Sequence, residues 1–293
     1  TLDFKYLESI YAQRFDFLNN KDMDQIYLFV GKNKIFDFES LNKFKKIYIN
    51  EDFNIKYNES VSLNIDNENR NLTIKQNDQT GRVVISGKII DSWKIVFIGD
   101  TSNKIQNVIK NYENLTGCLT FVDIILKNVN LSSKNSKCED SINLIRSRGN
   151  IAEIIIRDSK YDAIDADFSK LIIEDLKINN AGNDCLDFSF GEYKIENIDL
   201  KKCGDKGISV GEKSNAYFNN VKIQETNIGI ASKDSSLVEA NIVNIIDTKT
   251  CLSAYKKKQE FNFADIKIEK MNCFNFKKQF LIDRGSSINI KNL

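Results

Sequence analysis

Aspartates recur at a fixed interval through the middle of the chain. Asp140, Asp162 and Asp184 follow one another at intervals of 22 residues, and Asp165 and Asp187 are also 22 residues apart. Carboxylates held close together can do acid–base chemistry, because like charges raise the pKa of at least one of them. They can also bind calcium, which prefers oxygen ligands. A solvated ladder of turns is the third interpretation, because Asp favours turns.

The interval belongs to a longer repeat. Seven segments begin at this interval and share an apolar third residue: Ile142, Ile164, Leu186, Ile208, Ile230, Leu252 and Phe274. A second, mostly apolar column follows two residues later: Leu144, Ala166, Phe188, Val210, Ser232, Ala254 and Phe276. Side chains alternate between the faces of a strand, so both columns should point into the interior.

A coil of about 22 residues with two or three short strands is the period of a parallel β-helix. We therefore predict an all-β fold, a right-handed single-stranded parallel β-helix over residues 46–293, with regular coils from about residue 118. Apolar residues at helical spacing predict an N-terminal helical cap over residues 1–45, and residues 105–114 are compatible with a helical insertion. Earlier, less regular strands are expected at Ser60–Ile65, Leu72–Ile74, Val83–Ile90 and Trp93–Ile98.

The residues on either side of the inner column should face outward. One flanking column is small throughout: Ser141, Ala163, Cys185, Gly207, Gly229, Cys251 and Cys273. The other is short and mostly polar: Asn143, Asp165, Asp187, Ser209, Ala231, Ser253 and Asn275. Together they predict a shallow strip along which an extended polymer could lie, and the alternative is a tight bend that demands small residues.

The predicted strip changes from acidic to basic along the chain. Neighbouring strands lie about 4.8 Å apart, so Asp162 should stack against Asp184. Lys206 follows Asp184 in the same column, and Lys233 and the run Lys256–Lys258 lie further along. Lys206 is therefore placed to neutralise the aspartates or to act with them.

Composition excludes several classes of protein. The 293 residues include no His, so the chain can supply neither an imidazole base nor a histidine zinc ligand. A net charge of +1 gives no reason to expect nucleic acid, and no apolar run is long enough for membrane insertion. Six cysteines without a Cys-x-x-Cys pair do not indicate a disulfide framework in a chain of this size.

Four segments resemble the motifs of polygalacturonases, the pectin-hydrolysing β-helices of the pectate-lyase/polygalacturonase-like superfamily. The family motifs are Asn-Thr-Asp, Asp-Asp, Gly-His-Gly and Arg-Ile-Lys on successive coils. The corresponding segments here are Lys160–Asp162, Asn183–Asp184, Asp205–Gly207 and Ala231–Lys233. Asp162, Asp184 and Lys233 match the family, whereas Asn183 replaces an acid, Lys206 replaces the His, and the Arg has no counterpart.

The resemblance extends from Lys160 to Lys233 and implies contact with glycans. The wider group of carbohydrate-binding and sugar-hydrolase β-helices fits these residues better than pectin hydrolysis does. Residues 162–234 also resemble β-helix domains of bacterial surface proteins, some with CotH-type kinase-like domains, which implies an extracellular or cell-envelope setting. The chain begins with Thr1 rather than Met, so we expect further domains in a longer parent protein.

Two functions are compatible with these residues. The first is binding, with or without cleavage by a hydrolase or lyase, of an acidic polysaccharide. Asp162 and Asp184 would then be acid, base or calcium ligands, and the resemblance to lyases of this fold implies Lys206 as a base. Substrate contacts would come from Asp165, Asp187, Asn183, Lys233 and Ser209, and a calcium ion would be held by Asp162, Asp165, Asp184 and Asp187. The second function is a non-catalytic surface module for adhesion or protein interaction, in which the acidic ladder is structural.

Overall fold

The computed structural model describes residues 29–30, 33–34, 44–49, 51–101 and 115–292. The chain divides into two units, Thr1–Phe44 and Lys45–Leu293. In the first unit, β1 (Phe29–Val30) pairs with β2 (Asn33–Lys34) in an antiparallel ladder. The prediction of helix is therefore wrong at these four residues, which are strand; residues 1–28, 31–32 and 35–43 of the predicted cap, and the predicted insertion at 105–114, lie outside the described residues. No helix in the described part of the chain is long and apolar enough to cross a bilayer.

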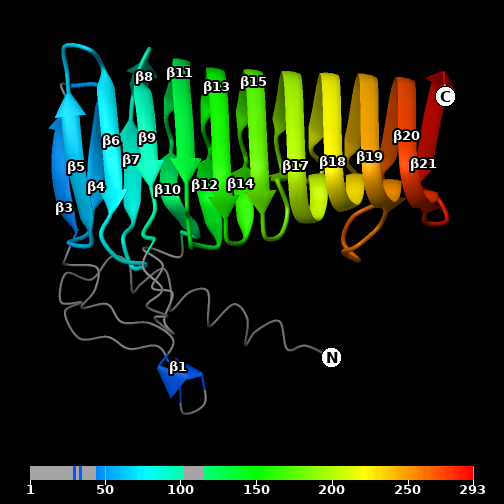
Figure 1. Cartoon of the computed structure of the whole chain (residues 1–293), viewed down its shortest axis with the longest axis horizontal. Coiled ribbons are helices and arrows are strands. Elements are labelled where there is room, and N and C mark those ends of the chain that lie inside the picture. The colour runs from blue at the N-terminus through cyan, green and yellow to red at the C-terminus, as the bar shows by residue number, and fades with distance from the viewer. Residues whose placement is uncertain (1–28, 31–32, 35–43, 50, 102–114, 293) are drawn as a thin grey trace. The chain divides into compact units, whose positions relative to one another are not determined.

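From Lys45 onward the chain forms a β-solenoid of about 10 turns, built from stacked parallel coils of about 22 residues (Figure 1). The strands of each regular coil lie on three faces of the solenoid, which we name faces A, B and C. Face A begins with β10 (Gly117–Val122), β12 (Asp140–Ile145), β14 (Asp162–Asp167) and β16 (Leu186–Ser189). It continues with the last residues of β17 (Glu192–Gly211), β18 (Asn215–Lys233), β19 (Leu237–Tyr255) and β20 (Asp265–Ile282).

Faces B and C are successive halves of the longer strands. In β15 (Lys170–Ala181), Leu171 and Ile173 point inward on face B, and Leu176 and Ile178 point inward on face C. The alternation changes phase between Ile173 and Leu176, where the chain bends from one face to the next. The same two faces include β11 (Ile125–Lys134), β13 (Arg148–Ser159), the first parts of β17–β19, β20 (Asp265–Ile282) and β21 (Ser287–Asn292).

The predicted inner columns are confirmed along most of the solenoid. The first column, from Ile142 to Leu252, has no exposed surface, and its members pair in register from coil to coil. The second column, from Leu144 to Ala254, is buried in the same way. The register also places Asp165 beside Asp187 on one side of the solenoid, as predicted.

The last step of the predicted repeat is wrong. Leu252 lies beside Phe280 and not beside Phe274. Phe274 instead lies beside Ile246 and is 61% exposed, and Phe276 is 40% exposed. Six extra residues in the loop between β19 and β20 shift the register, which also removes Cys273 and Asn275 from their predicted columns.

The column of small residues does not face outward as predicted. Ser141, Ala163, Cys185 and Cys251 have no exposed surface. A Cβ atom at Gly207 would lie 2.9 Å from the side chain of Ile223 inside the solenoid. The prediction that these residues form part of an outward-facing strip is therefore wrong. The alternative, a tight bend that admits only small residues, accounts for them.

The expectation that the cysteines form no disulfide framework is also wrong. The structure joins all six in three disulfides: Cys118–Cys138, Cys185–Cys203 and Cys251–Cys273. The paired residues are 18 to 22 positions apart, which is about one coil. A spacing of this kind becomes a contact only once the chain has coiled.

The solenoid begins with antiparallel strands. β3 (Lys45–Ile49) pairs with β4 (Phe53–Tyr57), and β4 pairs with β7 (Val83–Gly87), in both cases antiparallel. β5 (Val61–Asp66) pairs antiparallel with β6 (Asn71–Gln76). Strands are thus present where they were predicted between residues 60 and 98, but the strand predicted at Val83–Ile90 is divided into β7 and β8 (Ile89–Asp91). The strand predicted at Trp93–Ile98 is β9 (Lys94–Ile98).

Candidate functional site

The sequence-predicted site residues come together on face A. Strand pairing places Asp140 beside Asp162, and it places Asp165 beside Asp187. Asp187 in turn lies beside Ser209. The aspartates therefore occupy consecutive coils on one side of the solenoid, in the register that the repeat predicts.

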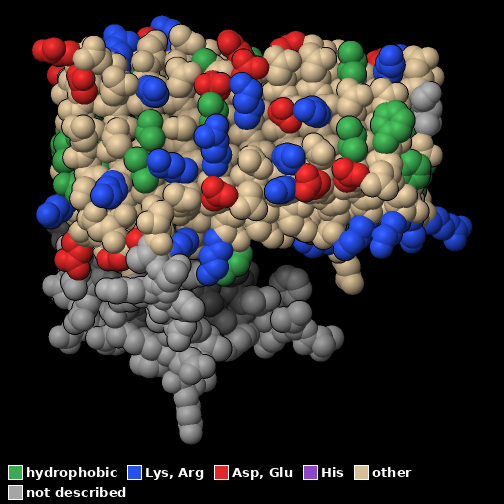
Figure 2. Space-filling model, viewed as in Figure 1, with side chains coloured by type: hydrophobic (Ala, Val, Ile, Leu, Met, Phe, Trp, Pro, Cys, Tyr) green, Lys and Arg blue, Asp and Glu red, His purple; other side chains and the backbone are tan. Residues whose placement is uncertain are grey.

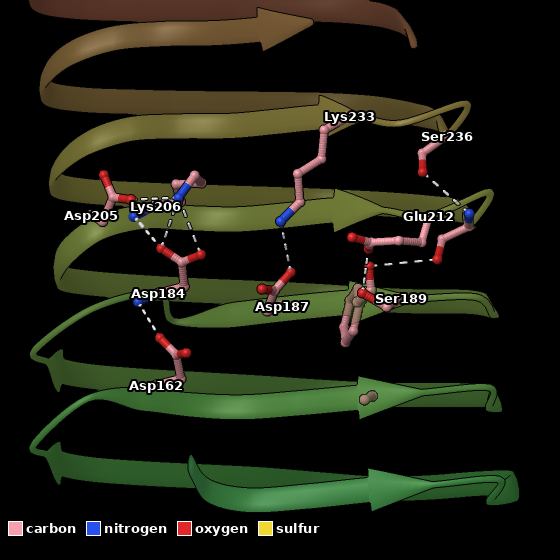
Figure 3. Close-up of polar contacts among 12 residues, drawn as sticks. Asp162, Asp184, Asp187, Ser189, Asp205, Lys206, Glu212, Lys233 and Ser236 are labelled. Carbon is pink, nitrogen blue, oxygen red and sulfur yellow. Dashed lines mark hydrogen bonds and ion pairs between the residues drawn. The ribbon is translucent and has the colours of Figure 1, made fainter. Parts of the chain in front are cut away.

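Asp162 and Asp184 each accept hydrogen bonds from the next coil. Oδ1 of Asp162 accepts a hydrogen bond from the backbone N–H of Asp184 at 2.7 Å (Figure 3). The same oxygen accepts a hydrogen bond from Nδ2 of Asn183 at 2.7 Å. Oδ1 of Asp184 accepts the backbone N–H of Lys206 at 2.9 Å. Each carboxylate thus fixes the coil that follows it. These contacts support the structural interpretation of the ladder for Asp162, Asn183 and Asp184.

Lys206 is held between two carboxylates. Its Nζ atom lies 3.4 Å from both carboxylate oxygens of Asp184 and contacts Oδ2 of Asp205 (Figure 3). Burial lowers the pKa of Lys206, but the hydrogen bond to Asp205 and the charge of Asp184 outweigh it, so the pKa lies above its ordinary value. An ammonium group stabilised in this way is a poor proton acceptor. The geometry therefore argues against Lys206 as a general base.

Lys233 crosses a whole coil to reach Asp187. Its Nζ atom lies 3.4 Å from Oδ1 of Asp187, 46 residues away in the sequence, and only 6% of the Lys233 side chain is exposed. The aliphatic chain passes over Gly211, where a Cβ atom would lie 2.7 Å from Cε of Lys233. Ser209 is fully buried. The predicted substrate contacts of Lys233 and Ser209 are therefore not supported.

Three partly exposed aspartates, Asp165, Asp167 and Asp187, point outward from the neighbouring strands β14 and β16. Burial raises the pKa of Asp165, and the charges of Asp140 and Asp167 raise it further. Nδ2 of Asn143 donates to Oδ2 of Asp165 at 2.9 Å. Burial raises the pKa of Asp167 to about 6, and the charge of Asp187 adds to this effect.

Two further aspartates of face A are buried. Asp140 and Asp184 are each 3% exposed. Burial raises the pKa of Asp140 to about 7, and burial raises that of Asp184 to about 6 against the opposing charge of Lys206. Oδ2 of Asp140 is buried and has no hydrogen-bond partner. These two carboxyl groups act on the stability of the coils, since a substrate cannot reach them.

An aromatic pair at the end of the strip was not predicted from the sequence. Phe168 and Phe190 are 56% and 41% exposed, and their rings stack with centroids 4.7 Å apart. Phe261 from the loop between β19 and β20 lies 6.0 Å from Phe190. Each stacked ring follows a polar outward residue, Asp167 or Ser189. The separation of Phe168 and Phe190 by one full repeat was the signal in the sequence.

The loop between β19 and β20 is tied to the same region. Oδ1 of Asp234 accepts the backbone N–H groups of Lys257 and Lys258, both at 2.7 Å. Nζ of Lys258 lies 2.7 Å from Oε1 of Glu212, and Ser189 donates to Oε2 of Glu212 at 2.5 Å. The lysine run, which could have been a solvated loop, thus reaches back over earlier coils. The charge of Lys258 acts on Asp167 and opposes the rise of its pKa.

The predicted calcium ligands do not converge. Within the described part of the chain, no group of three or more acidic or cysteine side chains is placed to hold a metal ion. Asp162 and Asp184 accept protein donors, and Asp187 is paired with Lys233. The calcium hypothesis for Asp162, Asp165, Asp184 and Asp187 therefore gains no support from the geometry.

Comparison with known proteins adds no assignment. The chain matches no protein family, no curated protein and no solved structure. The fold is accordingly established by the coils themselves. Function has to be argued from the side chains of face A and its surroundings.

Proposed function

We propose that this chain is a glycan-active β-solenoid protein that binds an uncharged polysaccharide along face A and hydrolyses a glycosidic bond there. The observation that carries the proposal is the contrast between two accessible carboxyl groups. Burial raises the pKa of Asp167 to about 6, whereas Asp187 is paired with Nζ of Lys233 at 3.4 Å. Glycoside hydrolysis uses one carboxyl group with a raised pKa as the acid and a second carboxyl group as the base.

The strand register gives this pair a suitable separation. Asp167 lies beside Ser189, and Asp187 is two residues before Ser189 on the neighbouring strand. In a parallel sheet, strands about 4.8 Å apart and a rise of about 3.3 Å per residue place these two positions about 8 Å apart along the backbone. Inverting glycosidases need about 6.5–9.5 Å between their carboxyl groups, so that a water molecule fits between base and substrate. We assign Asp167 as the general acid and Asp187 as the base, with inversion at the anomeric carbon.

The surroundings favour an uncharged glycan over the acidic polysaccharide expected from the sequence. Asp165, Asp167 and Asp187 would repel an acidic polymer, and Lys206 and Lys233 are already paired with aspartates. The exposed rings of Phe168 and Phe190 offer apolar surface beside the carboxyl groups. Kinship with the pectate-lyase/polygalacturonase-like superfamily and an extracellular or cell-envelope location belong to the same proposal.

A non-catalytic surface module is the second candidate. The observation that favours it is the chain of contacts from Asp162 through Asp184 to Lys206, in which each group binds the next coil. A ladder of this kind fixes the register of the solenoid whether or not any substrate is bound. In this case face A would bind a partner without cleaving it.

The two candidates differ in the products that they release. We expect the protein to release reducing ends from one or more of xylan, galactomannan and mixed-linkage β-glucan. Asp167→Asn and Asp187→Asn should each lower the rate by at least about 100-fold, because each removes one half of the proton transfer. The rate should also fall above about pH 6 as Asp167 loses its proton. Asp175→Asn, the same change on face C, is the matched control.

Two outcomes would contradict hydrolysis. One is an Asp167→Asn variant that keeps both the rate and the pH profile of the wild type. The other is a wild type that binds a glycan but releases no reducing ends, which is the behaviour of the second candidate. Melting temperatures of all variants show whether a lost rate reflects lost folding.

A further inference from the structure

Face B carries a groove that the site on face A does not use. Two rows of outward side chains follow the solenoid axis there, paired from coil to coil. One row is Lys170, Glu192, Asn215, Leu237, Asp265 and Ser287, and the other is Ile172, Lys194, Tyr217, Glu239, Lys267 and Asn289. Strands about 4.8 Å apart make each row about 24 Å long. The groove is therefore shaped for an extended polymer.

Two adjoining cavities lie along these rows. The first, of about 400 Å³, extends from Lys170 to Glu239, and the second, of about 610 Å³, extends from Tyr217 to Lys291. Tyr217 and Glu239 line both cavities, so the two cavities adjoin at this tyrosine. Volumes of this size are typical of binding sites for small molecules or for several units of a polymer.

Tyr217 is held in a defined orientation. Nδ2 of Asn241 donates to the Tyr217 hydroxyl at 2.7 Å, and Nζ of Lys194 lies 5.7 Å from the ring centroid. Ile172, which is 51% exposed, and Leu237 add apolar surface on the same face. A fixed aromatic ring between apolar patches can pack against the apolar face of a sugar ring.

The charges of the groove cancel. Lys170 pairs with Glu192 at 2.6 Å, Lys267 with Glu239 at 3.2 Å, and Lys291 with Glu269 at 2.7 Å. A face of alternating, paired charges attracts neither a polyanion nor a polycation strongly. It does offer many donors and acceptors for hydroxyl groups.

The backbone of face B excludes the usual mode of peptide binding. An extended peptide gains most of its affinity by pairing with an open strand edge. Strands β15 to β20, which underlie the groove up to its end at the terminal strand β21, are already paired with a neighbour on both sides. A ligand on this face meets side chains only. Amide, carboxylate and ammonium groups around one aromatic ring suit a glycan better than a peptide.

We infer that face B is a second binding surface, for an uncharged linear polysaccharide that runs along the solenoid axis with one sugar ring on Tyr217. This surface is separate from the Asp167–Asp187 pair on face A. It binds glycan whether or not face A is catalytic. In a catalytic protein, the face B surface would hold the polymer close to face A.

Affinity electrophoresis tests this surface. We expect gels that contain galactomannan or mixed-linkage β-glucan to retard the full chain, and gels that contain polygalacturonate to leave its mobility unchanged. Tyr217→Ala should weaken the binding about tenfold, and Tyr217→Phe, which keeps the ring, should retain most of it. Tyr48→Ala is the matched control, because Tyr48 is an exposed tyrosine on β3 with a lysine over its ring.

The result separates this inference from the proposed function. Asp167→Asn, which would stop hydrolysis, should be retarded as strongly as the wild type. The inference is overturned if Tyr217→Ala migrates like the wild type, or if no uncharged glycan retards the wild type. Loss of retardation in Asp167→Asn would also overturn it, because the binding would then belong to face A. A missing hydrolase activity would leave face B binding untouched.

Discussion

Face A and face B carry ion pairs of the same chemical type in different surroundings. On face A, the side chains of Lys233 and Asp187 are 6% and 27% exposed. On face B, those of Lys170 and Glu192 are 73% and 61% exposed. Charges of both signs are also interspersed over most of the face shown in Figure 2. Solvent therefore screens the pairs of face B and hardly reaches the cation of face A.

This difference decides what each pair contributes. An exposed pair adds little, because water solvates its members equally well when they are apart. A buried pair gains little on balance, but the loss of one partner leaves an unpaired charge in a poorly solvated place. The buried pairs of face A are thus a liability that a purely structural solenoid could avoid. These buried pairs lie beside accessible carboxyl groups, which fits the proposal that face A uses its charges in a function.

The largest expected effect comes from breaking the Lys233–Asp187 pair. Lys233→Ala should lower the free energy of unfolding by about 3 kcal/mol, because Asp187 loses its counterion and Gly211 loses the aliphatic chain above it. Lys267→Ala, which breaks an exposed pair with Glu239 on face B, should lower it by less than about 0.5 kcal/mol. Urea denaturation measures both. Equal losses would refute the distinction between the faces.

A pH series gives the next largest effect. The pKa of Asp140 is raised from 3.8 to about 7 in the folded chain, so its protonated form is the one that folding favours. This stabilising contribution is complete below about pH 4 and is lost as the pH rises to 7. The free energy of unfolding should thus be higher at pH 5 than at pH 8.

The variant Asp140→Asn isolates this effect, because an amide cannot ionise. The difference between pH 5 and pH 8 should shrink by about 2 kcal/mol in this variant. Asp199→Asn, at an exposed aspartate on face C, should leave the difference unchanged. A pH dependence that is identical in wild type and Asp140→Asn would show that Asp140 does not titrate in this range.

The coils could be predicted from the sequence because burial imposes a strict alternation. The columns that begin at Ile142 and Leu144 recur once in every coil, and each residue is buried against its counterpart in the next coil. The prediction that Phe274 continues the inner column is wrong, because this residue has the expected spacing and apolar character only by coincidence. Only the pairing of Leu252 with Phe280 reveals the six extra residues of the loop.

The site could be predicted only in outline. The repeat correctly placed Asp165 beside Asp187, but it could not show that Asp184 is buried or that Lys206 is fixed between two carboxylates. Such details depend on side-chain paths, such as that of Lys233 over Gly211, which link residues 46 positions apart. Alternation also fails at bends, and for this reason the small column was placed on the wrong side.

Salt gives the smallest expected effect and the most direct comparison of the faces. A double-mutant cycle on Lys170 and Glu192 should give a coupling of about 0.5 kcal/mol at low salt and almost none in about 1 M NaCl, where screening acts within about 3 Å. The same cycle on Lys233 and Asp187 should keep most of its coupling, because ions cannot enter between the two groups. If salt removed both couplings alike, Lys233 would have to be solvated in the folded protein. The carboxyl groups of face A would then lie in surroundings as well solvated as those of face B, and nothing would distinguish their proton exchange.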